Sequence, residues 1–157
     1  MLVSKTLTDI PAYVLLEDIK DANILGCWSK HLGEFDEIIG YSVLGAIFLR
    51  SSSTHNYLLL YPLRVSGNNS KNYGSFKSIT EFENKILKEK SFLKHCLAPI
   101  VPGQIPELQK RLGVLNAEQV YFPVPHPSIG GSWDISTFKK GNVWINADIA
   151  GQNKGIK

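Results

Sequence analysis

The segment NYLLLY, residues 56–61, constrains the fold more than any other stretch, because its apolar side chains fall on both faces of an extended strand. A strand that is apolar on both sides is usually a central strand of a sheet that is covered twice. Residues 37–41 and 45–50 precede it and are rich in strand formers, and the polar run 51–55 has the composition of a hairpin connection. Pro62 then limits further pairing. We therefore predict three consecutive strands that end with NYLLLY.

Helical signals surround these strands. Residues 13–32 carry apolar side chains at spacings of three to five, which predicts one helix or two short ones that end at Gly33. The polar run 64–75 predicts a loop. Ser78 and Glu81 match a capping box, in which a serine is followed three residues later by glutamate. The amphipathic segment that they open predicts a helix packed on a core.

The second half of the chain predicts two more helices and two strands. Residues 92–97 predict a short helix, and 106–112 predict another. The second of these has proline in its first turn and Gly113 just past its end, which is the order that helices favour. Residues 119–124 predict a strand, and the clean apolar–polar alternation of 142–149 predicts a half-buried strand.

Early strands, middle helices and late strands together predict the α+β class. We expect a mostly antiparallel or mixed sheet of five to six strands, with helices packed on one face. A length of 157 residues fits one domain, so we treat 1–157 as a single unit.

Composition excludes several classes of protein. The net charge is only +3, and the lysines are scattered rather than clustered, so we expect no direct contact with nucleic acid. Cys27 and Cys96 are far apart and form no CxxC pair, which leaves zinc and thioredoxin-like sites unsupported. We find neither a secretory signal nor an apolar run of membrane-spanning length, so we expect a cytoplasmic protein without membrane contact.

The common catalytic motifs are missing from the sequence: it has no GxSxG elbow, P-loop, GxGxxG or HExxH. Metal sites need several converging ligands, and the histidines do not pair at metal spacing. We therefore expect no catalytic or metal-binding residue, no cofactor and no enzymatic activity. The histidines are His31, His55, His95 and His126.

An acidic cluster is formed by Glu34, Asp36 and Glu37. Paired carboxylates can perform acid–base chemistry when their environments separate their pKa values. The same cluster can instead be a solvated loop, or a surface that contacts a basic protein and raises the association rate. A second acidic run at 17–21 has the same alternatives.

The stretch VPHPSIGGSW, residues 124–133, places His126 between two prolines and follows it with a glycine pair. Prolines fix φ and favour an extended residue before them, and the glycines allow a reversal, so the loop is stiff and pre-shaped. Such a loop suits catalysis by His126 with Asp134, a purely architectural role, or a docking surface that includes Trp133.

Three segments resemble one known family. Residues 32–63, preceded by Trp28, resemble the part in which a tryptophan-containing helix leads to an ALGdaF-type strand and hairpin. Residues 103–131 resemble the family's proline- and glycine-marked stretch, and 139–155 resemble its closing strand. By order and spacing, the chain from about residue 25 onward resembles the C-terminal domain of the type VI secretion immunity proteins that neutralise a DNase effector. Residues 1–25 resemble a shortened form of their N-terminal GAD-like portion, and we expect this segment to be helical.

The resemblance implies a cytoplasmic antidote, a monomer or weak homodimer, that binds a toxin and blocks its active site or substrate groove. We expect the toxin contacts to include Glu34, Asp36 and Glu37, which complement a basic nuclease groove, with Trp133 as an aromatic anchor and with His126 and Asp134 beside it. Two alternatives remain. One is a small enzyme or ligand-binding module that uses the Pro-His-Pro loop, and the other is a self-associating structural subunit.

Overall fold

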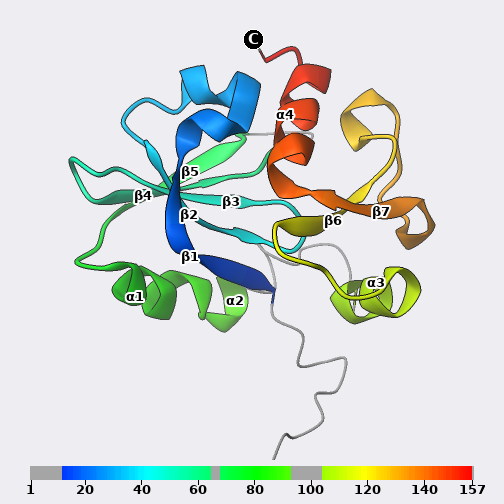
Figure 1. The fold of residues 1–157 in the computed structure, drawn as a ribbon, viewed down its shortest axis with the longest axis horizontal. Coiled ribbons are helices and arrows are strands. Elements are labelled where there is room, and N and C mark those ends of the chain that lie inside the picture. Colours follow the sequence, from blue (N-terminus) through cyan, green and yellow to red (C-terminus); the bar gives the residue numbers. More distant parts are fainter. Residues whose placement is uncertain (1–11, 65–67, 93–103, 157) are drawn as a thin grey trace, which may run out of the picture.

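The computed structural model describes residues 12–64, 68–92 and 104–156 and has an α+β architecture (Figure 1). Its main sheet is antiparallel and has five strands in the order β1-β2-β3-β4-β5, and a two-stranded antiparallel sheet follows. The predicted α+β class is confirmed. The strands are β1 (Tyr13–Asp21), β2 (Glu37–Ser42), β3 (Ile47–Arg50), β4 (Asn56–Leu60), β5 (Ser70–Ser75), β6 (Gln119–Pro123) and β7 (Phe138–Asn142).

The helical segments are short. The predicted capping box opens a helix at Ile79, and the predicted helix at 106–112 lies within a longer one. The short helix predicted at 92–97 falls almost wholly outside the described residues. The segments are the 3-10 run η2 (Ala22–His31), α1 (Ile79–Phe82), the π-helical turn η3 (Glu83–Leu87), α2 (Lys90–Phe92), α3 (Gln104–Leu112), the 3-10 turns η5 (Pro127–Ile129) and η6 (Ile135–Thr137), and α4 (Val143–Asn153).

Both faces of the main sheet are covered, rather than the one face predicted. Figure 1 shows α1 and α2 on one side of the sheet and α4 on the other. The reason lies in β4, whose Leu58 and Leu60 enter one core while Tyr57 and Leu59 enter the other. The first core is completed by η2, β6 and α4, and the second by α1 and η3.

The helix predicted over 13–32 is wrong in its first half, because residues 13–21 form the edge strand β1. The register of β1 against β2 shifts between Leu15 and Lys20, so its apolar side chains do not alternate regularly. That irregularity produced the helix-like spacing. The helical run begins only at Ala22, where the Asp21 side chain accepts a hydrogen bond from the Asn23 amide. The N-terminal segment 1–25 is therefore not helical over its described part up to Asp21.

The strand predicted at 142–149 is instead the helix α4. Asn142 caps it, because its side-chain oxygen accepts from the Trp144 and Ile145 amides at 2.9 and 3.0 Å. The loop predicted at 64–75 is also partly wrong, because residues 70–75 form β5. This edge strand is polar and pairs with β4 through its backbone, so it has no apolar pattern that would identify it.

Candidate functional site

The acidic residues Glu34, Asp36 and Glu37 lie at one end of the main sheet, beside the turn 51–55 that joins β3 to β4. Phe35, between the first two, is buried. Its burial leaves Glu34 and Asp36 exposed on either side of it. The structure therefore brings the three predicted acidic contact residues together, and we call Glu34 and Asp36 with the turn 51–55 the acidic edge.

The turn holds both exposed carboxylates. The Glu34 carboxylate accepts hydrogen bonds from Thr54 Oγ1 at 2.9 Å and from Asn56 Nδ2 at 3.0 Å. The Asp36 carboxylate accepts from the Ser52 amide nitrogen at 2.9 Å and from the Ser52 hydroxyl. The Ser52 donors hold the pKa of Asp36 below its ordinary value. Asp36 is therefore a fixed negative charge at neutral pH.

Glu37 belongs to a row of paired residues that runs across the sheet. Glu37 on β2 is opposite Arg50 on β3, and Arg50 is opposite Tyr57 on β4. Arg50 Nε donates to Glu37 Oε1 at 2.8 Å, and the two side chains are 21% and 26% exposed. Tyr57 is buried and lies in the core that contacts α1. The row therefore ends in a half-buried ion pair on the α1 side of the sheet.

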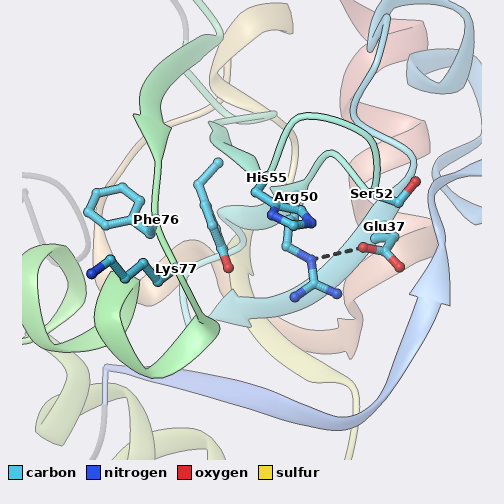
Figure 2. Close-up of a pocket in the computed structure, with 7 residues that line it drawn as sticks. Glu37, Arg50, Ser52, His55, Phe76 and Lys77 are labelled. Atoms are coloured by element: carbon cyan, nitrogen blue, oxygen red, sulfur yellow. Dashed lines mark hydrogen bonds and ion pairs between the residues drawn. The ribbon is translucent and has the colours of Figure 1, made fainter.

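This row forms one wall of a pocket of about 330 Å³ (Figure 2). In Figure 2 the Arg50 guanidinium lies between Glu37 and Ser52 on one side and Phe76 and Lys77 on the other. The pocket thus opens where the β3–β4 turn meets the segment that leads into α1. It is lined by Glu37, Arg50, Ser52, His55, Tyr57, Phe76 and Lys77.

The start of α1 fixes the opposite wall. The Ser78 hydroxyl accepts from the Glu81 amide at 3.0 Å, and the Glu81 carboxylate in turn accepts from the Lys77 amide at 2.8 Å. The Phe76 ring packs edge-on against Tyr57, with ring centroids 5.5 Å apart. Backbone capping and aromatic packing together place Lys77 at the pocket.

His126 faces the interior. It is only 6% exposed, and burial lowers the pKa of its imidazole, an effect that the neighbouring Asn146 opposes. The His126 carbonyl accepts from the Ile129 and Gly131 amides at 3.0 and 2.9 Å, which closes the loop on itself. The backbone of His126 therefore helps to shape the loop, and its ring has little surface to offer a partner.

Trp133 and Asp134 also serve the local structure. Trp133 is half-buried and packs against the small core of Leu108, Tyr121 and Phe138. The Asp134 side chain caps η6 by accepting from the Ser136 amide, and these hydrogen bonds hold the pKa of Asp134 below its ordinary value. In the described part of the chain no hydrogen bond joins Asp134 to His126.

The six predicted contact residues consequently fall into two groups. Figure 1 places the β3–β4 turn and the β6–β7 region at opposite ends of the molecule. Glu34 and Asp36 of the acidic edge lie with Glu37 at the first end, whereas His126, Trp133 and Asp134 lie at the second. They do not form one continuous surface.

Sequence reasoning missed Arg50, His55 and Lys77 as pocket residues. Arg50 ends a predicted strand, and its register with Glu37 depends on strand pairing that the sequence does not specify. His55 had one signal, its position at the end of the turn 51–55 before β4. Its backbone has φ of 61°, a conformation that is uncommon outside glycine and is often found at functional positions.

None of the helices in the described residues has the length and apolar character that a membrane span requires. In the same residues, no group of three or more His, Cys, Asp or Glu side chains is arranged to hold a metal ion.

Comparisons with known proteins show the fold. No protein-family model matches the chain, and no curated protein matches it. The chain is similar to the crystal structure of Atu4351 from Agrobacterium tumefaciens, with a TM-score of 0.58 and 19% sequence identity. The match covers 90% of this chain and 66% of that one, so this chain spans slightly less than two thirds of its neighbour. At this identity the likeness shows a shared fold.

Proposed function

We propose that the protein is a cytoplasmic immunity protein that binds a cognate antibacterial toxin and blocks its substrate groove. The proposed toxin is a type VI secretion nuclease effector. The observation that carries the proposal is the acidic edge, on which two exposed carboxylates are held by donors from the β3–β4 turn and from Asn56 at the start of β4. The inhibitor acts by steric and electrostatic obstruction, and it makes or breaks no covalent bond.

The charge of the acidic edge fits such a partner. A nuclease groove that holds phosphates is lined by lysine and arginine. Carboxylates on an inhibitor complement that lining, raise the association rate and disfavour partners of the wrong charge. The carboxylates of Glu34 and Asp36 are already hydrogen-bonded in the free protein, so little side-chain entropy is lost when the complex forms.

The first test is survival and co-purification. Cells that express the toxin encoded beside this gene should survive only when this protein is co-expressed, and the two proteins should co-purify. If the cells die and the proteins migrate separately, the immunity proposal is wrong.

The second test locates the contact. Glu34→Gln with Asp36→Asn should lower the association rate constant about tenfold at low salt and flatten its salt dependence. Asp18→Asn with Glu107→Gln removes the same charge from exposed positions on β1 and α3, and it should change the rate by less than about twofold. Stopped-flow measurements of the association rate constant compare the two double variants. Equal losses in both variants would show a general charge effect and would remove the acidic edge from the interface.

A further inference from the structure

We propose that the pocket around Arg50 receives the carboxylate of a single aspartate or glutamate side chain of the partner protein. This inference rests on the proposed function, because it takes the toxin as that partner. It assigns a binding role to Arg50, His55 and Lys77, the three pocket residues that sequence analysis missed.

Hydrogen-bond donors converge on this pocket. Arg50 donates its Nε–H to Glu37 at 2.8 Å, which occupies one of the five N–H groups of the guanidinium. The Tyr57 hydroxyl lies against the same guanidinium, and His55 and Lys77 complete the polar lining. A carboxylate is an acceptor only and matches the planar fork of arginine, so it is the group that such a lining selects.

The pocket lining carries both signs of charge. Arg50 and Lys77 contribute two positive charges and Glu37 one negative charge, and the carboxylates of Asp36 and Glu81 lie near enough to interact with Arg50 and Lys77. Half-burial of Arg50 and Glu37 weakens solvent screening there compared with the open surface. An incoming carboxylate is therefore held by the hydrogen-bond donors of Arg50 and Lys77 rather than by the net charge of the region.

The acidic edge decides between a protein carboxylate and a nucleic acid. Asp36 is bonded to Ser52, which lines the pocket, and Glu34 is bonded to the same turn. A nucleic acid backbone carries closely spaced negative charges, so its neighbouring phosphates would meet these two carboxylates. An isolated carboxylate surrounded by basic side chains satisfies both the pocket and the acidic edge. That arrangement fits a nuclease groove in which acidic residues hold metal ions between phosphate-binding cations.

The pocket has more than enough room for one side chain. Its volume of about 330 Å³ is within the range for small-molecule pockets. Tyr57 and Phe76 supply aromatic surface against which the methylene groups of a glutamate can pack. The pocket can thus accommodate one aliphatic acid.

Propionate, which reproduces the end of a glutamate side chain, is the probe for the free protein. In an NMR titration at constant ionic strength, the Arg50 Nε–H signal and the His55 and Lys77 amides should shift and saturate, with a dissociation constant on the order of 10 mM. Lys77→Met should weaken binding at least about threefold through the lost charge. Lys85→Met, which removes an exposed lysine that pairs with Glu81 instead, should leave it unchanged.

Three results would overturn the inference: equal shifts with sodium chloride, tighter binding of inorganic phosphate than of propionate, or no effect of Lys77→Met. The test needs no toxin, so it separates the two proposals. Saturable propionate binding without rescue of toxin-expressing cells would keep the pocket assignment and refute the immunity role. Rescue of toxin-expressing cells without propionate binding would keep the immunity role and refute the pocket assignment.

Discussion

Gly151 is a position at which one added methyl group should disturb the packing of α4 on η2. The glycine is buried, and a Cβ placed on it would lie 2.4 Å from Cys27 Sγ and 2.7 Å from Trp28 Nε1. Both neighbours belong to η2 and are anchored to α4. Trp28 Nε1 donates to the Ala147 carbonyl at 2.7 Å, and the Cys27 amide donates to Asp148 at 2.8 Å. Gly151→Ala therefore forces the two helical segments apart.

The size of the effect follows from three contributions. Overpacking of a buried position costs about 1–3 kcal/mol. Stretching the Trp28 indole and Cys27 amide hydrogen bonds just named costs roughly 1 kcal/mol for each bond. Alanine regains about 1 kcal/mol because it is a better helix former than glycine. The net loss is about 3 kcal/mol, a large part of the roughly 5–15 kcal/mol that stabilises an ordinary domain.

Urea unfolding followed by tryptophan fluorescence measures this loss, and the melting temperature should fall by about 6–12 °C. Cys27→Ala in the same chain removes the nearest clashing atom and should recover part of the stability lost by Gly151→Ala. A Gly151→Ala protein that is as stable as the parent, or more stable, would refute the close approach of α4 to η2.

Two further predictions concern titrating groups. Ser52→Ala removes the hydroxyl donor from Asp36, so the pKa of Asp36 should rise toward its ordinary value. A carboxyl NMR titration measures this shift. An unchanged pKa would contradict the observed hydrogen bond. Burial lowers the pKa of His126, so the unfolded chain binds a proton near pH 6.5 that the folded protein does not bind. The free energy of unfolding should therefore decrease as the pH falls below about 6.5. His126→Gln should flatten that decrease in urea unfolding curves between pH 7.5 and 5.5, whereas an unaltered slope would assign it to other groups.

The central part of the fold could be predicted because burial on both faces leaves a strong signal. The NYLLLY segment became β4, and the prediction that it is covered twice is confirmed by the two cores to which it contributes. The capping box at Ser78 is an equally local signal, since both of its partners lie within one turn. Features that depend on a few neighbouring residues could therefore be predicted from the sequence.

The strand and helix errors share a physical cause. In 143–149 the apolar residues happen to alternate, but Ile145 is 62% and Ile149 45% exposed, so the alternation does not mark a buried face. The informative signals were the Asn142 cap and the small residues Ala147, Ala150 and Gly151, spaced as on one helix face. For β1 the shifted register removed the alternation that a strand should show.

The candidate site could be predicted only in part. The acidic side chains were visible in the sequence, but the donors that hold them lie 16 to 22 residues away. Antiparallel pairing of β2 with β3 and of β3 with β4 brings these donors to Glu34 and Asp36. The pocket needs in addition the segment before α1, which contacts the sheet through Phe76. Such a site depends on pairing between distant segments, which a single sequence does not reveal.

The same hydrogen bonds bear on the alternative in which the acidic cluster performs acid–base chemistry. A carboxylic acid that donates a proton at neutral pH needs a raised pKa, which a dry apolar environment or a nearby like charge provides. Asp36 has the opposite environment, because the Ser52 amide and hydroxyl both donate to its charged form and lower its pKa. It therefore keeps its charge far below neutral pH. A charge that persists and is fixed in place favours electrostatic recognition over proton transfer at Asp36.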